Sequence, residues 1–164
     1  MRTLELTVPA PADLGIELLG VPEGSPVEVH LRLESVMEGV LASGTAQVVL
    51  VGECVRCLDR FDDDLEVAVQ ELYVYPESEA GPDEASRLDG ELFDLEPALR
   101  DAVVLALPFR PVCEPECPGL CLECGAHLRD DPDHTHEESI DPRWAALSTL
   151  NTTKAGELLS RDEE

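Results

Sequence analysis

The first half of the chain alternates hydrophobic and polar residues, which is typical of β-strands with one buried and one solvent-facing side. The clearest stretch is 27–33, where Val27, Val29, Leu31 and Leu33 alternate with charged or polar residues. Similar patterns open the chain and return twice further along it. We therefore predict strands over residues 3–8, 27–33, 36–51 and 65–74.

Several features interrupt this pattern. The stretch 12–25 lacks regular alternation and ends in turn-forming residues, so we expect a loop there. Gly39 and Gly44 indicate bulges or bends in the strand that contains them. The buried side changes around Gln70 and Glu71, which predicts a further bulge.

One segment of the second half has the periodicity of a helix. Leu99, Val103 and Leu107 recur at helical spacing, a proline suits the first turn, and a second proline follows the last residue. We predict a helix over residues 97–107 that packs against the sheet.

These elements predict an α+β fold: a mainly antiparallel β-sheet or partial barrel with one packed helix and a C-terminal zinc-knuckle extension. The predicted β-rich core domain spans residues 1–112. A Cys- and His-rich metal-binding extension follows over 113–150, with a short helix from Asp141 to about Leu150. Residues 151–164 are expected to form a flexible tail.

Charge limits the partners that the chain can bind. Its 36 acidic and 11 basic residues give a formal net charge of −25 at pH 7. Nucleic-acid binding draws much of its affinity from Lys and Arg at phosphates, so extensive direct contact with RNA or DNA is disfavoured. The charge fits a basic protein partner, and the alternative is that it only keeps the chain soluble. Residues 76–90 predict a mobile acidic loop or a partner-facing insertion.

The start of the chain lacks the apolar stretch of a signal peptide, and no segment approaches the ~20 apolar residues of a membrane span. We therefore expect a cytoplasmic protein that does not enter a membrane.

Thiols stay reduced in the cytoplasm, so closely spaced cysteines favour a metal over disulfides. The metal that we expect is structural zinc, as one or two ions. The six cysteines are Cys54, Cys57, Cys113, Cys117, Cys121 and Cys124.

Three ligand arrangements are open. The four clustered cysteines can share one zinc and leave the earlier pair unused, or the two pairs with a two-residue gap can form one zinc ribbon. The third arrangement adds two histidines, and its eight ligands fill two tetrahedral sites, a count that favours it. Its two ligand sets are Cys54, Cys57, Cys113 and Cys117, and Cys121, Cys124, His134 and His136.

The histidine ligands have an ordinary alternative. His134 and His136 lie one residue apart in an Asp-rich stretch, where they can bind one metal from an extended segment or simply be solvated. His127 has a weaker case as a ligand.

Eight ligands for two ions leave no open position for a catalytic zinc, and the sequence has no His-Glu-x-x-His, phosphate loop or nucleophile elbow. We therefore expect no enzymatic activity. The alternative is a zinc- or redox-responsive module in which Arg56 lowers the pKa of a thiol at Cys54 or Cys57.

An ordered set of motifs carries a family resemblance. The motifs are Cys-Val-Arg-Cys-Leu at 54–58, Leu-Ala-Leu-Pro at 105–108, the cysteine-rich stretch at 112–125 and Asp-Pro-Arg-Trp-Ala-Ala-Leu at 141–147. From about residue 25 to 150 the chain resembles the YceD family, the large ribosomal RNA subunit accumulation proteins.

The resemblance implies a cytoplasmic role in 23S rRNA accumulation and large-subunit assembly, and a frequent gene neighbour that encodes a small zinc-containing protein of that subunit. Members often carry Cys-x-Cys in place of His134-Thr135-His136, and some lack the second knuckle, which fits two separable metal sites. With a charge of −25, we expect the chain to act on a basic ribosomal protein or assembly factor instead of coating RNA.

Overall fold

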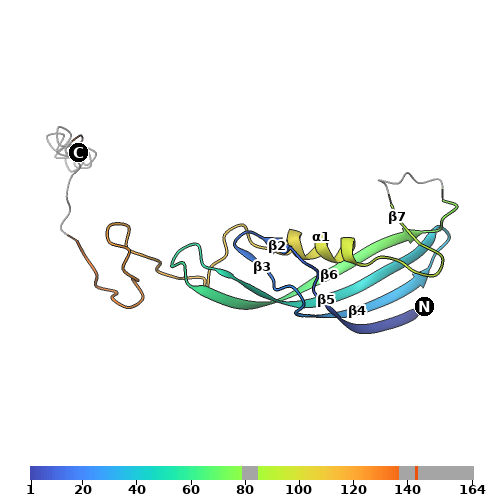
Figure 1. Ribbon diagram of the computed structural model, residues 1–164, viewed down its shortest axis with the longest axis horizontal. Helices are drawn as coiled ribbons and strands as arrows, with labels where there is room; N and C mark the ends of the chain where they lie inside the picture. Colours follow the sequence, from blue (N-terminus) through green and yellow to red (C-terminus); the bar gives the residue numbers. More distant parts are fainter. Residues whose placement is uncertain (79–84, 137–142, 144–164) are drawn as a thin grey trace, which may run out of the picture. The chain divides into compact units, whose positions relative to one another are not determined.

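The computed structural model describes residues 1–78, 85–136 and 143 (Figure 1). The chain divides into two compact units, Met1–Asp130 and Asp131–Glu164. The named helices and strands of the described residues all lie in the first unit. They are β1 (Arg2–Pro9), β2 (Leu14–Ile16), β3 (Leu19–Val21), β4 (Pro26–Ser35), β5 (Gly39–Glu53), β6 (Arg60–Val74), β7 (Ser86–Arg87) and α1 (Glu96–Ala106).

The strands form one seven-stranded, mainly antiparallel sheet that curves as a half-barrel. β5 is its central strand. One edge of β5 pairs first with β4 and then with β3, and the other edge pairs with β6 along the whole strand. β1 lies outside β4, β2 pairs with β3, and β7 adds in parallel to the end of β6. The prediction of a mainly antiparallel sheet with one helix is confirmed.

The core lies between the sheet and α1. Leu99 and Val103 of the helix and Leu107 just after it are buried against the inward side chains of the strands, as predicted. The helix begins one residue earlier than predicted, at Glu96. Arg100 donates hydrogen bonds to the backbone carbonyls of residues 12 and 13, which fastens α1 to the start of the β2–β3 hairpin.

The predicted loop over residues 12–25 is wrong in its middle, where β2 and β3 form a short hairpin. Leu14, Leu19 and Val21 point into the core and are buried. Each strand has only three residues, so neither is long enough to display an alternating pattern in the sequence.

The bulges predicted at Gly39 and Gly44 are absent, because the pairing of β5 with β4 and β6 has no break in register. Close backbone approach explains Gly44 instead. A Cβ atom added there would lie 1.9 Å from the carbonyl oxygen of His30 on β4. The lack of a side chain at Gly44 therefore allows β4 to lie this close to β5.

The bulge predicted at Gln70 and Glu71 is also wrong, since the same register continues through both residues. The change of pattern has another cause: Tyr73 and Val74, consecutive residues on opposite sides of β6, are both buried. Tyr73 stacks on Phe93 with ring centroids 4.4 Å apart. Both sides of the sheet are thus covered where β6 ends.

Within the predicted acidic loop 76–90, Ser86 and Arg87 form β7, which the sequence did not indicate. Residues 79–84, the helix predicted from Asp141 to about Leu150, and the predicted tail 151–164 lie outside the described residues, apart from residue 143. Among the residues that the structure describes, no helix is long and apolar enough to cross a membrane. The predicted domain boundaries remain predictions.

Candidate functional site

The first group of cysteines begins at the tip of the β5–β6 hairpin. The backbone N–H of Cys54 donates to the carbonyl of Asp59 at 2.9 Å, and the N–H of Leu58 donates to the carbonyl of Cys54 at 2.9 Å. Leu58 closes this turn with a positive φ of 62°. The turn presents Cys54 and Cys57 from a rigid mount.

The segment after α1 supplies the other two sulfurs. The N–H of Val55 donates to the carbonyl of Pro111 at 2.9 Å, which joins this segment to the hairpin tip. Further on, Gly119 has a positive φ of 81°, and a Cβ added there would lie 3.1 Å from the carbonyl oxygen of Arg56. Cys113 and Cys117 are held against the tip between these two contacts.

The four sulfurs have the spacing of a tetrahedral metal site. The Sγ atoms of Cys54 and Cys117 are 3.8 Å apart, those of Cys57 and Cys113 are 3.7 Å apart, and all four lie within 4.8 Å of one another. Zinc–sulfur bonds of about 2.3 Å in a tetrahedron place the sulfurs about 3.8 Å apart. All four are free thiols, and these separations are far longer than a disulfide bond. The donor set therefore fits zinc.

Burial makes this group difficult to ionise without a cation. Cys54, Cys57 and Cys117 are buried, whereas Cys113 is half-buried. Burial raises the pKa of Cys57 to about 12 and also raises the pKa of Cys117. For Cys54, burial opposes ionisation, but hydrogen bonds from backbone N–H groups outweigh it and lower the pKa to about 6. One thiolate is favoured, and four adjacent thiolates need a bound metal ion.

Two arginines contact the thiol group from outside. Arg129 donates to the Sγ of Cys113 at 3.2 Å and to Glu114 at 2.8 Å, and both contacts raise the pKa of Arg129. The guanidinium of Arg56 donates to the carbonyl of Cys117 at 2.8 Å. Arg56 stands out in the sequence because it lies between two cysteines, whereas no local pattern indicates Arg129.

The second pair of cysteines with a two-residue gap, Cys121 and Cys124, lies in a tight turn that we call the second knuckle. The N–H of Cys121 donates to the carbonyl of Ala126 at 2.8 Å, and the N–H of Gly125 donates to the carbonyl of Cys121 at 2.9 Å. Gly125 has a positive φ of 74°. This turn carries Cys121 and the exposed Cys124.

His134 and His136 direct their Nε2 atoms at each other, 2.8 Å apart. Asp131 lies 3.5 Å from the Nδ1 of His134, where a carboxylate can orient a ligating imidazole. The ligand atoms of the two histidines and of Cys121 and Cys124 lie within 4.8 Å of one another. His127 is outside both groups, with its Nδ1 3.7 Å from Asp59.

The eight predicted ligands are thus grouped as in the third arrangement, and neither of the other two arrangements matches the structure. Binding of zinc at either group remains a prediction. The two groups differ in their surroundings. The four-cysteine group contains three buried residues, whereas the Cys2His2 group is half-buried or exposed throughout. Phe61 packs on both the main core and the four-cysteine group, which links that group to the body of the fold.

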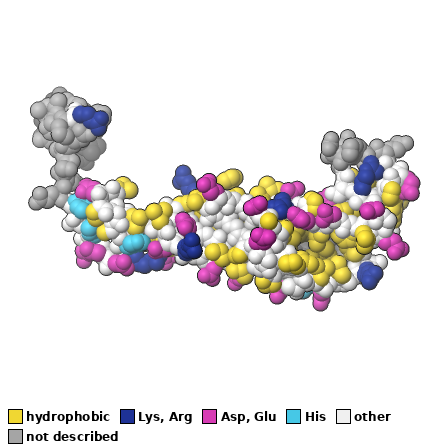
Figure 2. Space-filling view, viewed as in Figure 1, with side chains coloured by type: hydrophobic (Ala, Val, Ile, Leu, Met, Phe, Trp, Pro, Cys, Tyr) yellow, Lys and Arg dark blue, Asp and Glu magenta, His cyan; other side chains and the backbone are white. Residues whose placement is uncertain are grey.

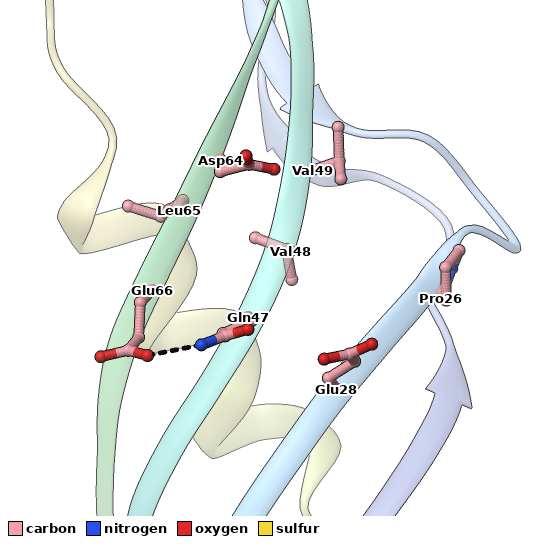
Figure 3. Close-up of a pocket in the computed structure, with 8 residues that line it drawn as sticks. All are labelled: Pro26, Glu28, Gln47, Val48, Val49, Asp64, Leu65 and Glu66. Atoms are coloured by element: carbon pink, nitrogen blue, oxygen red, sulfur yellow. Dashed lines mark hydrogen bonds between the residues drawn. The ribbon is translucent and has the colours of Figure 1, made fainter.

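A second feature is the acidic outer face of the sheet. Asp and Glu side chains are spread over the first unit and outnumber Lys and Arg (Figure 2). The strand register places Glu28, Asp64 and Glu66 on one face with Val49, and all four are exposed. They line an open groove of about 400 Å³ in which Gln47 donates to Glu66 at 2.6 Å (Figure 3). Such a groove suits cationic side chains with aliphatic stems.

Comparison with known proteins gives a family match and several relatives. Residues 42–151 match the family described as large ribosomal RNA subunit accumulation protein YceD. An "uncharacterized protein" of Mycobacterium tuberculosis is 48% identical over 151 residues, which cover 90% of this chain and 72% of the relative. A counterpart in Mycobacterium leprae is 41% identical over 151 residues, covering 90% of this chain and 69% of the relative.

A more distant relative carries a functional name. The "Large ribosomal RNA subunit accumulation protein YCED homolog 1, chloroplastic" of Arabidopsis thaliana is 23% identical over 159 residues, which cover 79% of this chain and 50% of the relative. No solved structure matches the chain. The family match includes all eight candidate ligands.

Proposed function

The chain belongs to the YceD family, and we propose that it is a non-enzymatic ribosome biogenesis factor that supports 23S rRNA accumulation and large-subunit assembly. The family match over residues 42–151 carries this proposal, because the family's name concerns accumulation of the large ribosomal RNA. In the proposal the protein works in the cytoplasm, where ribosomes are assembled.

The chain acts by binding a basic ribosomal protein or assembly factor. A net charge of −25 opposes close approach to the RNA backbone and attracts proteins that are rich in Lys and Arg. The groove formed by Glu28, Asp64 and Glu66 supports this choice, since its carboxylates flank exposed Val49. A Lys or Arg stem can pack on the valine while its charged end reaches a carboxylate.

Zinc has a structural role in this proposal. Cys54 and Cys57 from the hairpin tip, with Cys113 and Cys117 from the segment after α1, would hold one ion. Cys121, Cys124, His134 and His136 would hold the other. A bound ion supplies cross-links between segments that are distant in sequence. Four protein ligands at each centre leave no open position for a substrate.

A redox-responsive module that uses Cys54 and Cys57 is the alternative function. Both side chains are buried, with exposed fractions of 0% and 4%, and reactive cysteines need access to solvent. The proposal therefore assigns these thiols to metal binding. Unchanged thiol reactivity after the metal is stripped would argue against a redox or metal-sensing role.

The proposed function is tested by deleting the gene and by capturing partners. Deletion should lower the ratio of 23S rRNA to small-subunit rRNA and deplete large subunits on a sucrose gradient. A pull-down from extract should return a basic protein and lose it as the salt concentration is raised. Recovery of naked 23S rRNA that resists high salt, without any protein, would refute the proposed mode of action.

A further inference from the structure

Strand β1 has a free edge. It pairs with β4 in unbroken register from Arg2 with Leu33 to Pro9 with Pro26, and no described residue pairs with its other side. An unpaired edge presents a row of backbone N–H and C=O groups to another strand.

Proteins usually protect such edges with bulges, inward-pointing charges, internal prolines or very short strands. β1 has none of these features: it is eight residues long, and its proline is the last residue. The side chains that point towards the core are Leu4, Leu6 and Val8, and all three are only half-buried. The edge is therefore open, and the inward side chains beside it are incompletely covered.

An apolar groove of about 350 Å³ lies beside this edge. Its walls are β1 on one side and the segment leading into α1 on the other, and hydrophobic side chains gather in the region of β1 and β4 (Figure 2). A strand added to β1 would place every second side chain over this groove, because side chains alternate between the two faces of a sheet. The apolar lining includes Leu4, Leu6, Val8, Phe93, Leu95 and Leu99.

The negative charge of the chain indicates which kind of segment would bind at the edge of β1. Asp94 and Glu96 lie at the rim of the groove. Arg100 pairs with Glu96 at 2.8 Å, and Asp94 accepts a hydrogen bond from the backbone N–H of Glu96 at 3.0 Å. A second copy of the chain would bring another net charge of −25 to the same edge, and like charges of this size oppose association. A basic segment suits the charge of the whole chain and the exposed Glu5 on the outer face of β1.

We propose that the free edge of β1 and this groove bind an extended segment of the basic partner as an added strand. Its alternate apolar side chains fill the groove, and the Lys or Arg side chains between them point to the outer face of the sheet, where Glu5 of β1 is exposed. The basic character of the partner rests on the proposed function, whereas the place and mode of binding come from the edge and the groove.

The test measures binding of a fluorescein-labelled eight-residue peptide of alternating Val and Lys to the full chain by fluorescence anisotropy. The matched probe has N-methyl groups on every second amide, which remove the edge hydrogen bonds while leaving charge and side chains unchanged. The methylated peptide loses three or four hydrogen bonds and should bind at least about tenfold more weakly. Equal binding of the two peptides would overturn strand addition.

Two pairs of variants locate the site. Leu6→Glu places a charge in the groove and should weaken peptide binding about tenfold, whereas Thr7→Gln on the outer face of β1 should change it by less than about twofold. Glu5→Lys, also on the outer face, should weaken binding about fivefold, more than Asp101→Lys on the exposed side of α1. The Glu5 pair keeps the test valid if Leu6→Glu does not fold. Equal effects within the Glu5 pair would overturn the assignment.

The outcomes separate this inference from the proposed function. If a basic protein is captured equally by wild type, by Leu6→Glu and by Glu5→Lys, strand addition at β1 is wrong and the proposed function stands. If no basic protein is captured by wild type while the peptide binds as expected, the proposed function fails. Self-association that Leu6→Glu abolishes would assign the edge to a second copy and overturn the inference.

Discussion

The Sγ of Cys54 lies 3.8 Å from the Sγ of Cys117, although 63 residues separate them in the sequence. Cys54 directly follows strand β5, and Cys117 lies beyond α1. The pair therefore joins the hairpin tip to the segment that follows the helix. A zinc ion bound at this point would close a long loop of the main fold, whereas one bound at the second knuckle would close a short one.

Cys117→Ser and Cys121→Ser should differ in their effect on stability. The first removes a ligand from the buried centre and should lower the free energy of unfolding of the first unit by about 3 kcal/mol or more. The second should leave that unfolding within about 1 kcal/mol of wild type. Urea denaturation followed by far-UV circular dichroism measures both. Identical global unfolding in the two variants would favour a single shared site.

Arg129→Met should make the four-cysteine centre release its metal faster. The variant keeps the length of the side chain but removes the hydrogen bond to the Sγ of Cys113, the half-buried ligand. Loss of such an outer contact commonly costs about tenfold in metal affinity. Transfer of zinc to a chromogenic chelator measures the effect, with Arg110→Met as a control at an exposed arginine beyond α1. Equal release from the two variants would contradict a stabilising role for Arg129.

Tyr73→Phe should stabilise the protein. The Tyr73 hydroxyl is buried without a hydrogen-bond partner among the described residues, while its ring stacks on Phe93. Phenylalanine keeps the ring and removes the unsatisfied group, so the free energy of unfolding should rise by about 1 kcal/mol. Thermal and urea unfolding should agree on the sign. Tyr75→Phe is the control, because its hydroxyl contacts Ser35 at 3.2 Å and the change should not stabilise.

The buried hydroxyl of Tyr73 also predicts that the free energy of unfolding depends on pH in the alkaline range. Burial, with Glu71 and Asp94 nearby, raises the pKa of Tyr73 from 10 to about 12. The folded state therefore holds this proton more tightly than the unfolded state does. The resulting stability is present below pH 10 and is lost as the pH rises through 12, by up to about 3 kcal/mol. Tyr73→Phe should flatten this part of the profile, and an unchanged slope would contradict the assignment.

Gly44→Ala should destabilise the sheet, because the new Cβ would lie 1.9 Å from the carbonyl oxygen of His30. The strands must separate to admit it, at a cost of about 2 kcal/mol or more. Ser43→Ala, one residue earlier on β5, should cost less than about 1 kcal/mol. Equal unfolding free energies for the two variants would show that β4 and β5 tolerate a wider spacing.

Local patterns predicted the parts of the fold that depend on one continuous segment. The alternation of Val27, Val29 and Leu31 placed β4, and the spacing of Leu99 and Val103 placed α1. Patterns failed where a neighbouring segment decided the outcome. The glycines of β5 indicated bulges, yet Gly44 is needed for the close approach of β4, and the three-residue strands β2 and β3 were too short to detect.

The candidate metal centres were likewise predictable only where the spacing of residues along the chain was enough. Spacing and a count of eight ligands were enough to propose the two groups, because tetrahedral zinc requires four ligands each. The contact of Arg129 with Cys113 depends on how the chain folds back after the second knuckle, so no local pattern carries it. The open edge of β1 likewise appears only when the order of the strands is known.

Native mass spectrometry with elemental analysis of the full chain tests the two-centre arrangement most directly. Wild type should carry two zinc ions, and Cys117→Ser and Cys121→Ser should each retain one. The retained ion should resist chelation more strongly in Cys121→Ser, which keeps the buried four-cysteine centre intact. One ion in wild type that both variants lose would contradict two separate centres, and no ion in wild type would contradict metal binding altogether.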